Sequence, residues 1–239
     1  MIELRAGRRV RAIEMDVPLR RGGMREAKRY QTSLVQEQLN LKYAYQKFEF
    51  ALYANFSPRD WLVELTYDDA HLPQQYDEAT RRIKYFLRKL REARKARGDE
   101  LRYLYVTEGM HGAGRMHHHI VINAGAEDHV ALEALWKQGF VWYQRLGEFR
   151  GEGNTEGLHA VAMYLTKEPR KTGRLRLGQH MWTPSRGLRQ AERREWELAP
   201  GEHYLPPTGA EAFPGSRCPE RRENVFGTFY SYDFEVPIF

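Results

Sequence analysis

Between residues 61 and 168 the sequence alternates between strand-like and helix-like segments, and this order constrains the fold more than any other feature. Strand patterns occupy four segments: 61–67, 101–108, 116–123 and 139–146. Helical patterns occupy three others: 77–97, 128–137 and 157–168. The chain order is therefore strand, helix, strand, strand, helix, strand, followed by a further helix.

This order predicts an α+β fold with an antiparallel sheet, a ferredoxin-like or RNA-recognition-like βαββαβ core, and helices packed on one face. The other face is then free for a ligand. A Gly-rich connection, HGAGR (111–115), joins the second and third strands as a hairpin. In the usual strand order for this topology the third strand is central, so the histidine-rich segment 116–123 is expected in mid-sheet.

The flanking segments are harder to interpret. Residues 1–23 are basic and punctuated by glycine, and we expect an irregular N-terminal arm. Residues 24–54 show helical periodicity and predict a helical extension. The core domain is then expected over 55–170, and residues 171–239, with a Pro- and Gly-rich stretch and an aromatic ending, form a C-terminal appendage of the same domain.

Composition narrows the partners and the compartment. The 38 Lys and Arg residues exceed the 32 Asp and Glu residues, which favours an anionic partner, with nucleic acid as the first expectation. Cys218 is the only cysteine, so an internal disulfide and a thiolate zinc site are excluded and a reducing compartment fits. No stretch of about 18 apolar residues is present, so we expect a soluble, cytoplasmic protein without a membrane partner.

The stretch RMHHHIVIN (115–123) carries the first candidate site. Alternate strand side chains share a face, so His117 and His119 lie together, and His118 points to the opposite, core-facing side. Glu108 ends the preceding strand, and hairpin pairing can bring it beside them. Two imidazoles and a carboxylate can hold Mg²⁺ or Mn²⁺ and leave coordination positions for substrate. The alternative is a group of ordinary surface histidines and a solvated acid.

The sequence YLTKE (164–168) carries the second candidate site. Tyr164 and Lys167 are three residues apart on a predicted helix and therefore share a face. A tyrosine near a divalent cation can attack a phosphodiester, and a nearby ammonium stabilises the negative charge. The alternative is that Tyr164, one of 14 tyrosines, only packs in the helix interface.

Together these motifs resemble the HUH endonucleases, and within them the single-tyrosine rolling-circle replication initiators, the Rep proteins. The two histidines around one residue match His117 and His119, although His118 stands where the family usually has an apolar residue. Glu108 matches the acidic ligand of the preceding strand, and Tyr164 with Lys167 matches the nucleophile helix. LVELTYDD (62–69) is similar to the upstream strand motif, which contains Thr66. The resemblance covers about residues 60–170.

The resemblance implies a replication initiator that nicks single-stranded origin DNA next to a hairpin in a host cell. Glu108, His117 and His119 would hold Mg²⁺ or Mn²⁺, and Tyr164 would form a 5′-phosphotyrosine and release a 3′-hydroxyl. Lys167 would stabilise charge, and the phosphotyrosine would allow later strand joining.

Further expected DNA contacts are basic, aromatic or hydroxyl side chains near these motifs: Thr66, Arg115, Arg170, Lys171, Arg174, Trp182 and Arg186. Core packing explains Trp182 equally well. Residues 81–97 hold nine Lys or Arg against one acid, which fits either DNA contact or a solvated helix face.

Two other functions remain open. One is a single-tyrosine transposase or relaxase of the same superfamily. The other is a non-catalytic RNA- or DNA-binding module, in which Tyr103 and Tyr105 serve as stacking platforms.

Overall fold

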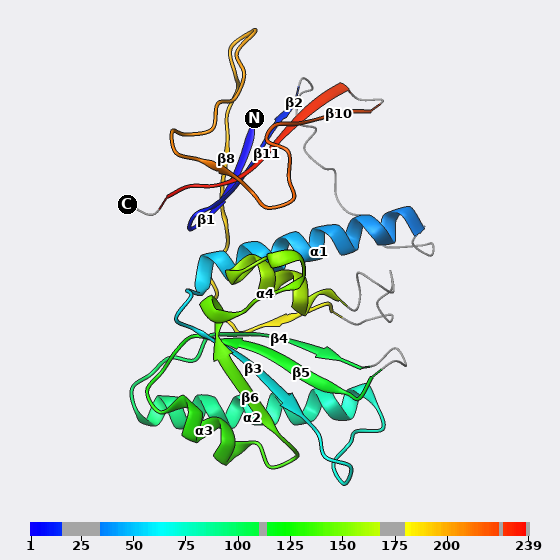
Figure 1. Cartoon of the computed structure of the whole chain (residues 1–239), viewed down its shortest axis with the longest axis vertical. Coiled ribbons are helices and arrows are strands. Elements are labelled where there is room, and N and C mark those ends of the chain that lie inside the picture. The colour runs from blue at the N-terminus through cyan, green and yellow to red at the C-terminus, as the bar shows by residue number, and fades with distance from the viewer. Residues whose placement is uncertain (16–33, 110–113, 168–179, 225–226, 238–239) are drawn as a thin grey trace. The chain divides into compact units, whose positions relative to one another are not determined.

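The computed structural model describes residues 1–15, 34–109, 114–167, 180–224 and 227–237 (Figure 1). The chain divides into two compact units, one formed by Val35–Leu188 and the other by Met1–Leu34 together with Arg189–Phe239. Each unit contains its own antiparallel sheet. The two are considered separately.

The Val35–Leu188 unit is built on a five-stranded sheet. Its strands, in spatial order, are β6 (Val141–Arg145), β3 (Trp61–Thr66), β5 (His117–Ile122), β4 (Tyr103–Glu108) and β7 (Thr183–Pro184). All neighbouring pairs are antiparallel. The predicted α+β class and antiparallel sheet are confirmed, and the histidine strand β5 lies in the middle of the sheet.

Helices cover both faces of this sheet, which corrects the prediction of one open face. Helices α2 (Tyr76–Ala96) and α3 (Asp128–Leu135) lie on one face, and α1 (Leu34–Asn55) and α4 (Gly157–Leu165) lie on the other (Figure 1). Two short 3₁₀ helices, η1 (Leu146–Glu148) and η2 (Glu152–Asn154), precede α4. Every helix in the described ranges is too short or too polar to cross a membrane.

The second covered face follows from the strand sequences, which are apolar on both sides at one end of the sheet. Leu62 and Val63 are adjacent in β3 and point to opposite faces, yet both are buried. Val63 packs with the side chains of α2 and α3, whereas Leu62 packs with Phe48 and Leu52 of α1 and with α4. Burial on both faces requires helices on both faces.

The α1/α4 face becomes polar toward the other end of its strands. Alternation places five polar side chains on this face: Glu64, Thr66, Glu108, His117 and His119. The apolar part of the same face is where α1 and α4 pack. The polar end of the sheet is therefore the place where a ligand can meet strand residues.

The other unit consists of a six-stranded antiparallel sheet. Its main path is β10 (Glu220–Asn224), β11 (Gly227–Glu235), β2 (Arg9–Met15), β1 (Ile2–Ala6) and β8 (Glu192–Glu195), and β9 (Glu211–Ala212) pairs with β11. The expectation of an irregular arm over 1–23 is wrong for the described residues 1–15, because β1 and β2 form a hairpin. Their register with β8 and β11 joins the two ends of the chain.

The predicted 171–239 appendage is accordingly divided by the structure. Strand β7 pairs with β4 in the first sheet, while the segment from Arg189 onward joins the second unit. Pairing partners nearly two hundred residues apart leave no local sequence signal, and this explains the difference. The expected helix over 24–54 is seen from Leu34 onward, and its earlier part lies outside the described residues.

A buried carboxylate organises the second unit. Glu14 accepts hydrogen bonds from His203 Nδ1 at 2.6 Å, the Tyr204 backbone N–H at 3.0 Å and the Tyr232 hydroxyl at 3.0 Å. Burial alone would raise the pKa of Glu14, but these hydrogen bonds outweigh it and hold the pKa below its ordinary value of 4.5. The ionised form is therefore the one that the fold stabilises.

Replacing Glu14 with Gln should remove an acid-dependent part of the stability. A carboxylate with a lowered folded pKa stabilises the native state fully above its unfolded pKa, near 4.5, and loses this contribution as the pH falls through the folded pKa. Urea unfolding from pH 7 to pH 3 should therefore show a steeper loss in the wild type than in Glu14→Gln. Parallel curves would contradict this assignment.

A buried ion pair holds α2 against the loop that leads into α3. The Arg94 guanidinium donates to both carboxylate oxygens of Asp128, from Nε at 3.1 Å and from an NH2 group at 2.8 Å. It also donates to Asn123 Oδ1 at 3.0 Å and to the Glu100 carbonyl at 3.1 Å. Both Arg94 and Asp128 are fully buried, so each depends on the other for charge compensation.

Asp128→Ala should lower the free energy of unfolding by about 3–5 kcal/mol, because it leaves the Arg94 charge buried without its carboxylate. Glu92→Ala is the matched control on the same helix, since Glu92 pairs with Arg88 and Lys89 on the exposed surface. Its effect should stay below roughly 0.5 kcal/mol. Equal effects of the two substitutions in urea unfolding would show that the buried pair has no special weight.

Candidate metal centre

The register of the central strand brings the predicted ligands together. His117 of β5 lies opposite Glu108 of β4, and opposite Thr66 of β3 on its other side. His119, two residues on, lies opposite Glu64 of β3. Directly opposed residues in an antiparallel pair have Cβ atoms about 5 Å apart, so these side chains must share one small area of the sheet face.

The three predicted ligands form a compact cluster. One potential donor atom from each of Glu108, His117 and His119 lies within 4.8 Å of the others. The Nε2 atoms of the two histidines are 3.1 Å apart, and Glu108 Oε2 is 3.5 Å from Nε2 of His117 and 3.6 Å from Nε2 of His119. A buried group of two histidines and one glutamate can thus hold a metal ion.

The hydrogen bonds around the cluster fit a cation. His117 Nδ1 lies 2.8 Å from the Arg115 carbonyl, which only accepts, so Nδ1 donates and Nε2 of the neutral ring keeps its lone pair. Among the described residues, Glu108 Oε1 and His119 Nδ1 are buried without a hydrogen-bond partner. Two ligands about 2.1 Å from one ion at right angles lie roughly 3 Å apart, which agrees with the two Nε2 atoms.

Electrostatics keep the carboxylate ionised in this buried position. Burial by itself would raise the pKa of Glu108, but hydrogen bonds from His117 and His119 and the charges of His119 and Lys167 lower it to about 2. The Glu108 side chain is thus a permanent anion at neutral pH. A buried anion in contact with two imidazoles attracts a divalent cation.

His118 has a structural role, as predicted from its alternation. It is fully buried on the α2/α3 face, 2.7 Å from the Tyr67 hydroxyl through Nε2 and 2.9 Å from Thr107 Oγ1 through Nδ1. Burial, together with the charges of His117 and His119, lowers its pKa to about 3, so its ring is neutral. These contacts fix the middle of β5 and so orient the two flanking histidines.

The proposed nucleophile lies next to this cluster. The ring centroid of Tyr164, on α4, is 5.0 Å from that of His119. Lys167 follows the helix after Thr166, its C-cap, and its Nζ is 3.6 Å from the centre of the Tyr164 ring and 3.3 Å from Glu108 Oε2. The structure therefore gathers the five residues predicted from separate motifs: Glu108, His117, His119, Tyr164 and Lys167.

The remaining predicted DNA contacts are dispersed. Thr66 lies on the site face, where its hydroxyl donates to the Phe140 carbonyl at 3.4 Å. Arg115 is exposed at the start of β5 and pairs with Asp69 at 2.6 Å. Arg186 lies apart from the metal ligands, in a groove that it shares with Lys84, Arg91 and Lys95. Arg170, Lys171 and Arg174 lie outside the described residues.

Trp182 takes the packing role that the sequence left open. Its indole N–H donates to the Ala44 carbonyl at 3.1 Å, and its ring is 5.6 Å from that of Phe48. The aromatic pair expected in a simple binding module is also unsuited to stacking on bases. Tyr105 is buried on the α2/α3 face, and Tyr103 packs partly against the same core.

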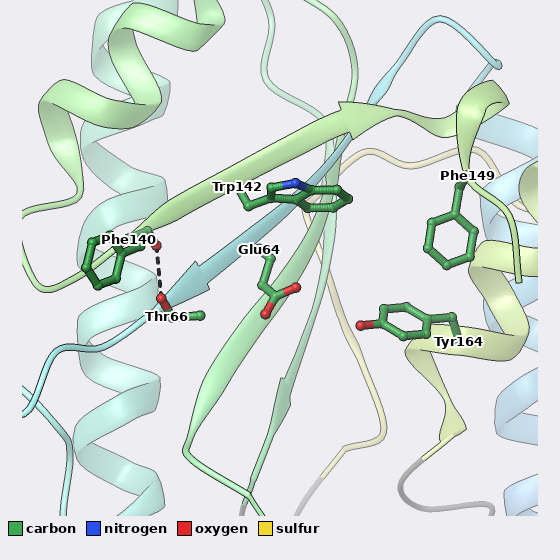
Figure 2. Close-up of a pocket in the computed structure, with 6 residues that line it drawn as sticks. All are labelled: Glu64, Thr66, Phe140, Trp142, Phe149 and Tyr164. Carbon is green, nitrogen blue, oxygen red and sulfur yellow. Dashed lines mark hydrogen bonds between the residues drawn. The ribbon is translucent and has the colours of Figure 1, made fainter.

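Sequence reasoning missed part of the site. A cavity of about 340 Å³ adjoins the phenol of Tyr164 and is also lined by Glu64, Thr66, Phe140, Trp142 and Phe149 (Figure 2). Alternation in WLVELTY already places Glu64 on the same face as Thr66. Phe140 and Trp142 carry no such signal, because their position beside Tyr164 depends on β6 pairing with β3.

Comparison with known proteins identifies a family for the segment that carries these residues. Residues 60–172 match the family model of the replication-associated protein ORF2. The matched segment contains every member of the metal cluster together with Tyr164 and Lys167. No curated protein and no solved structure matches the chain. The predicted relationship to replication-associated proteins is thereby confirmed, and its narrower class is taken up below.

Substitution of a clustered histidine should abolish tight metal binding. His119→Ala removes a buried nitrogen ligand, and we expect the affinity for Mn²⁺, measured by calorimetry on the full chain, to fall by at least about tenfold. His71→Ala is the control, because His71 is exposed and pairs with Asp68. A similar affinity in the wild type and His119→Ala would place the ion elsewhere.

Proposed function

We propose that this protein is a replication initiator of the single-tyrosine HUH endonuclease class, which nicks single-stranded origin DNA and can rejoin it. One observation carries the proposal: the phenol ring of Tyr164 lies 5.0 Å from the ring of His119, within the cluster that also contains Glu108, His117 and Lys167. The match of residues 60–172 to a replication-associated family supports it independently.

The residues divide the chemistry among themselves. Glu108, His117 and His119 would hold one Mg²⁺ or Mn²⁺, which when bound neutralises charge on a non-bridging oxygen of the scissile phosphate. The Tyr164 oxygen attacks phosphorus, a tyrosine–phosphate ester bond forms, and the bond to the 3′-oxygen breaks. The phenol proton is released and the departing 3′-oxygen takes up one proton, so the step is balanced.

Lys167 provides the positive charge closest to the nucleophile. Its ammonium contacts the Tyr164 ring and the Glu108 carboxylate, and it can therefore stabilise negative charge on the phenol oxygen or on the phosphate. The products are a 5′-phosphotyrosine and a free 3′-hydroxyl. Attack of a 3′-hydroxyl on the phosphotyrosine reverses the step and joins strands without a nucleotide cofactor.

DNA binding is proposed to extend from the site along basic residues. Arg115 lies at the start of the histidine strand, and Arg170, Lys171 and Arg174 follow Lys167 in the sequence. Charge neutralisation of phosphates by such residues makes affinity fall steeply with salt. We place the substrate in an origin next to a hairpin, and the protein in the cytoplasm of a host cell.

The replication-associated family favours an initiator over a transposase or relaxase of the same superfamily. Cleavage of origin hairpins rather than transposon ends would separate these. The non-catalytic binding module is less consistent with the structure, because Tyr105 is buried and a metal-competent cluster adjoins Tyr164.

A covalent adduct tests the proposal directly. The full chain, incubated with hairpin-flanked single-stranded oligonucleotides and Mn²⁺, should yield a DNA–protein species that survives a denaturing gel. Tyr164→Phe removes the attacking oxygen, so the adduct should fall by at least about 100-fold while DNA binding is retained.

Tyr143→Phe is the matched control for this assay. Tyr143 lies on the opposite face of the sheet, with its ring against Trp61 and its hydroxyl 3.3 Å from Glu133. The adduct should form normally in this variant. Loss of the adduct in Tyr143→Phe with retention in Tyr164→Phe would transfer the nucleophile role, and tight binding without any adduct would establish the binding-module function.

A further inference from the structure

The cavity beside Tyr164 is built from two neighbouring strands and from the α4 region. Glu64 and Thr66 come from β3, Trp142 lies in β6, and Phe140 immediately precedes β6. Phe149 and Tyr164 close the other side, with ring centroids 5.1 Å apart. Figure 2 shows the Glu64 carboxylate and the Tyr164 hydroxyl directed toward one another across this space.

A row of paired residues connects the cavity to the metal cluster. Trp142 lies opposite Glu64, and Glu64 lies opposite His119. The Glu64 carboxylate is 3.9 Å from His119 Nδ1. A strand whose phosphate reaches Tyr164 must therefore place an adjacent nucleotide over or inside the cavity.

The aromatic residues of the cavity are unusually open to solvent. Phe140 is 76% exposed and Trp142 is 49% exposed. Large apolar side chains left in water at a concave site are typical of ligand contacts. Flat rings beside a predicted single-stranded substrate suit base stacking, which is the commonest way in which proteins hold unpaired bases.

One carboxylate gives the cavity a chemical preference. Glu64 is partly exposed and offers only hydrogen-bond acceptors, so its partner in a ligand must be a donor. Cytosine, adenine and guanine each carry an exocyclic amino group, whereas thymine presents carbonyl oxygens at the corresponding positions. Guanine is the best complement, because its ring N–H and amino group are adjacent donors that match two carboxylate oxygens.

We propose that this cavity is a base-specific pocket for a nucleotide adjoining the scissile phosphate, which stacks on Phe140 or Trp142 and donates its amino group to Glu64. The pocket selects amino-bearing bases, guanine above all, and disfavours thymine. This inference rests on the proposed function for its substrate, single-stranded DNA, and adds the basis of its sequence preference.

Adduct sequencing can reveal the preference and does not require a known origin sequence. The full chain and Mn²⁺ are incubated with a pool of single-stranded DNA that is random over an internal segment, and both the protein-linked and the released fragments are sequenced. One of the positions flanking the cut should be depleted of thymine by at least about tenfold, as expected for a direct base contact. Glu64→Gln should reduce this depletion, because an amide also donates to carbonyl oxygens.

Binding without chemistry provides a second readout. In chelator, with Tyr164→Phe as the background, short oligonucleotides that differ only at the preferred position should bind with different affinities. Trp142→Ala should weaken the favoured oligonucleotide by at least about fivefold, as expected for loss of one stacked base. Tyr43→Ala is the matched control, because Tyr43 is a similarly exposed aromatic residue on α1, outside the cavity.

The outcomes separate the pocket from the nicking chemistry. A base preference in binding that depends on Glu64 and Trp142 supports the pocket even if no adduct forms, in which case the proposed function alone fails. Adducts with equal base frequencies at both flanking positions overturn the pocket and leave the function intact. If Glu64→Gln slows all sequences equally and leaves the preference unchanged, Glu64 only orients His119 and the inference is also overturned.

Discussion

The pairing of β5 with both β3 and β4 is the constraint on which the site depends. Central position in the sheet gives β5 a hydrogen-bonded neighbour on each side, so its register cannot slip without moving every side chain to the opposite face. The buried His118, held by Tyr67 and Thr107, anchors that register from the far face. His117 and His119 are oriented as a consequence.

This arrangement costs stability, because it buries ionisable groups in a core. Glu108 is almost completely buried yet ionised, and it is compensated by two imidazoles and by Lys167. Removing any member would leave the others with an uncompensated charge or an unfilled hydrogen bond. The covering helices exclude water from the apolar half of the same face, which strengthens the electrostatic interactions at its polar edge.

The sheet also explains why the metal cluster and the cavity adjoin. Rows of opposed residues run across the strands, so one row carries His119, Glu64 and Trp142 in sequence from β5 to β6. A cation-binding surface therefore passes into an aromatic one within the width of three strands. Helix α4 closes both from above, with Tyr164 at their boundary.

The sequence by itself determined the strand and helix order of residues 61–168, the antiparallel class, and the five residues Glu108, His117, His119, Tyr164 and Lys167, because period-two and helical spacing are local properties. Tertiary structure decided what depends on distant pairing: helices on both faces, the union of the N-terminal strands with β11, and the meeting of Glu64 with Trp142. Local patterns show which face a residue occupies, but only the packed chain shows which residues from other elements share it.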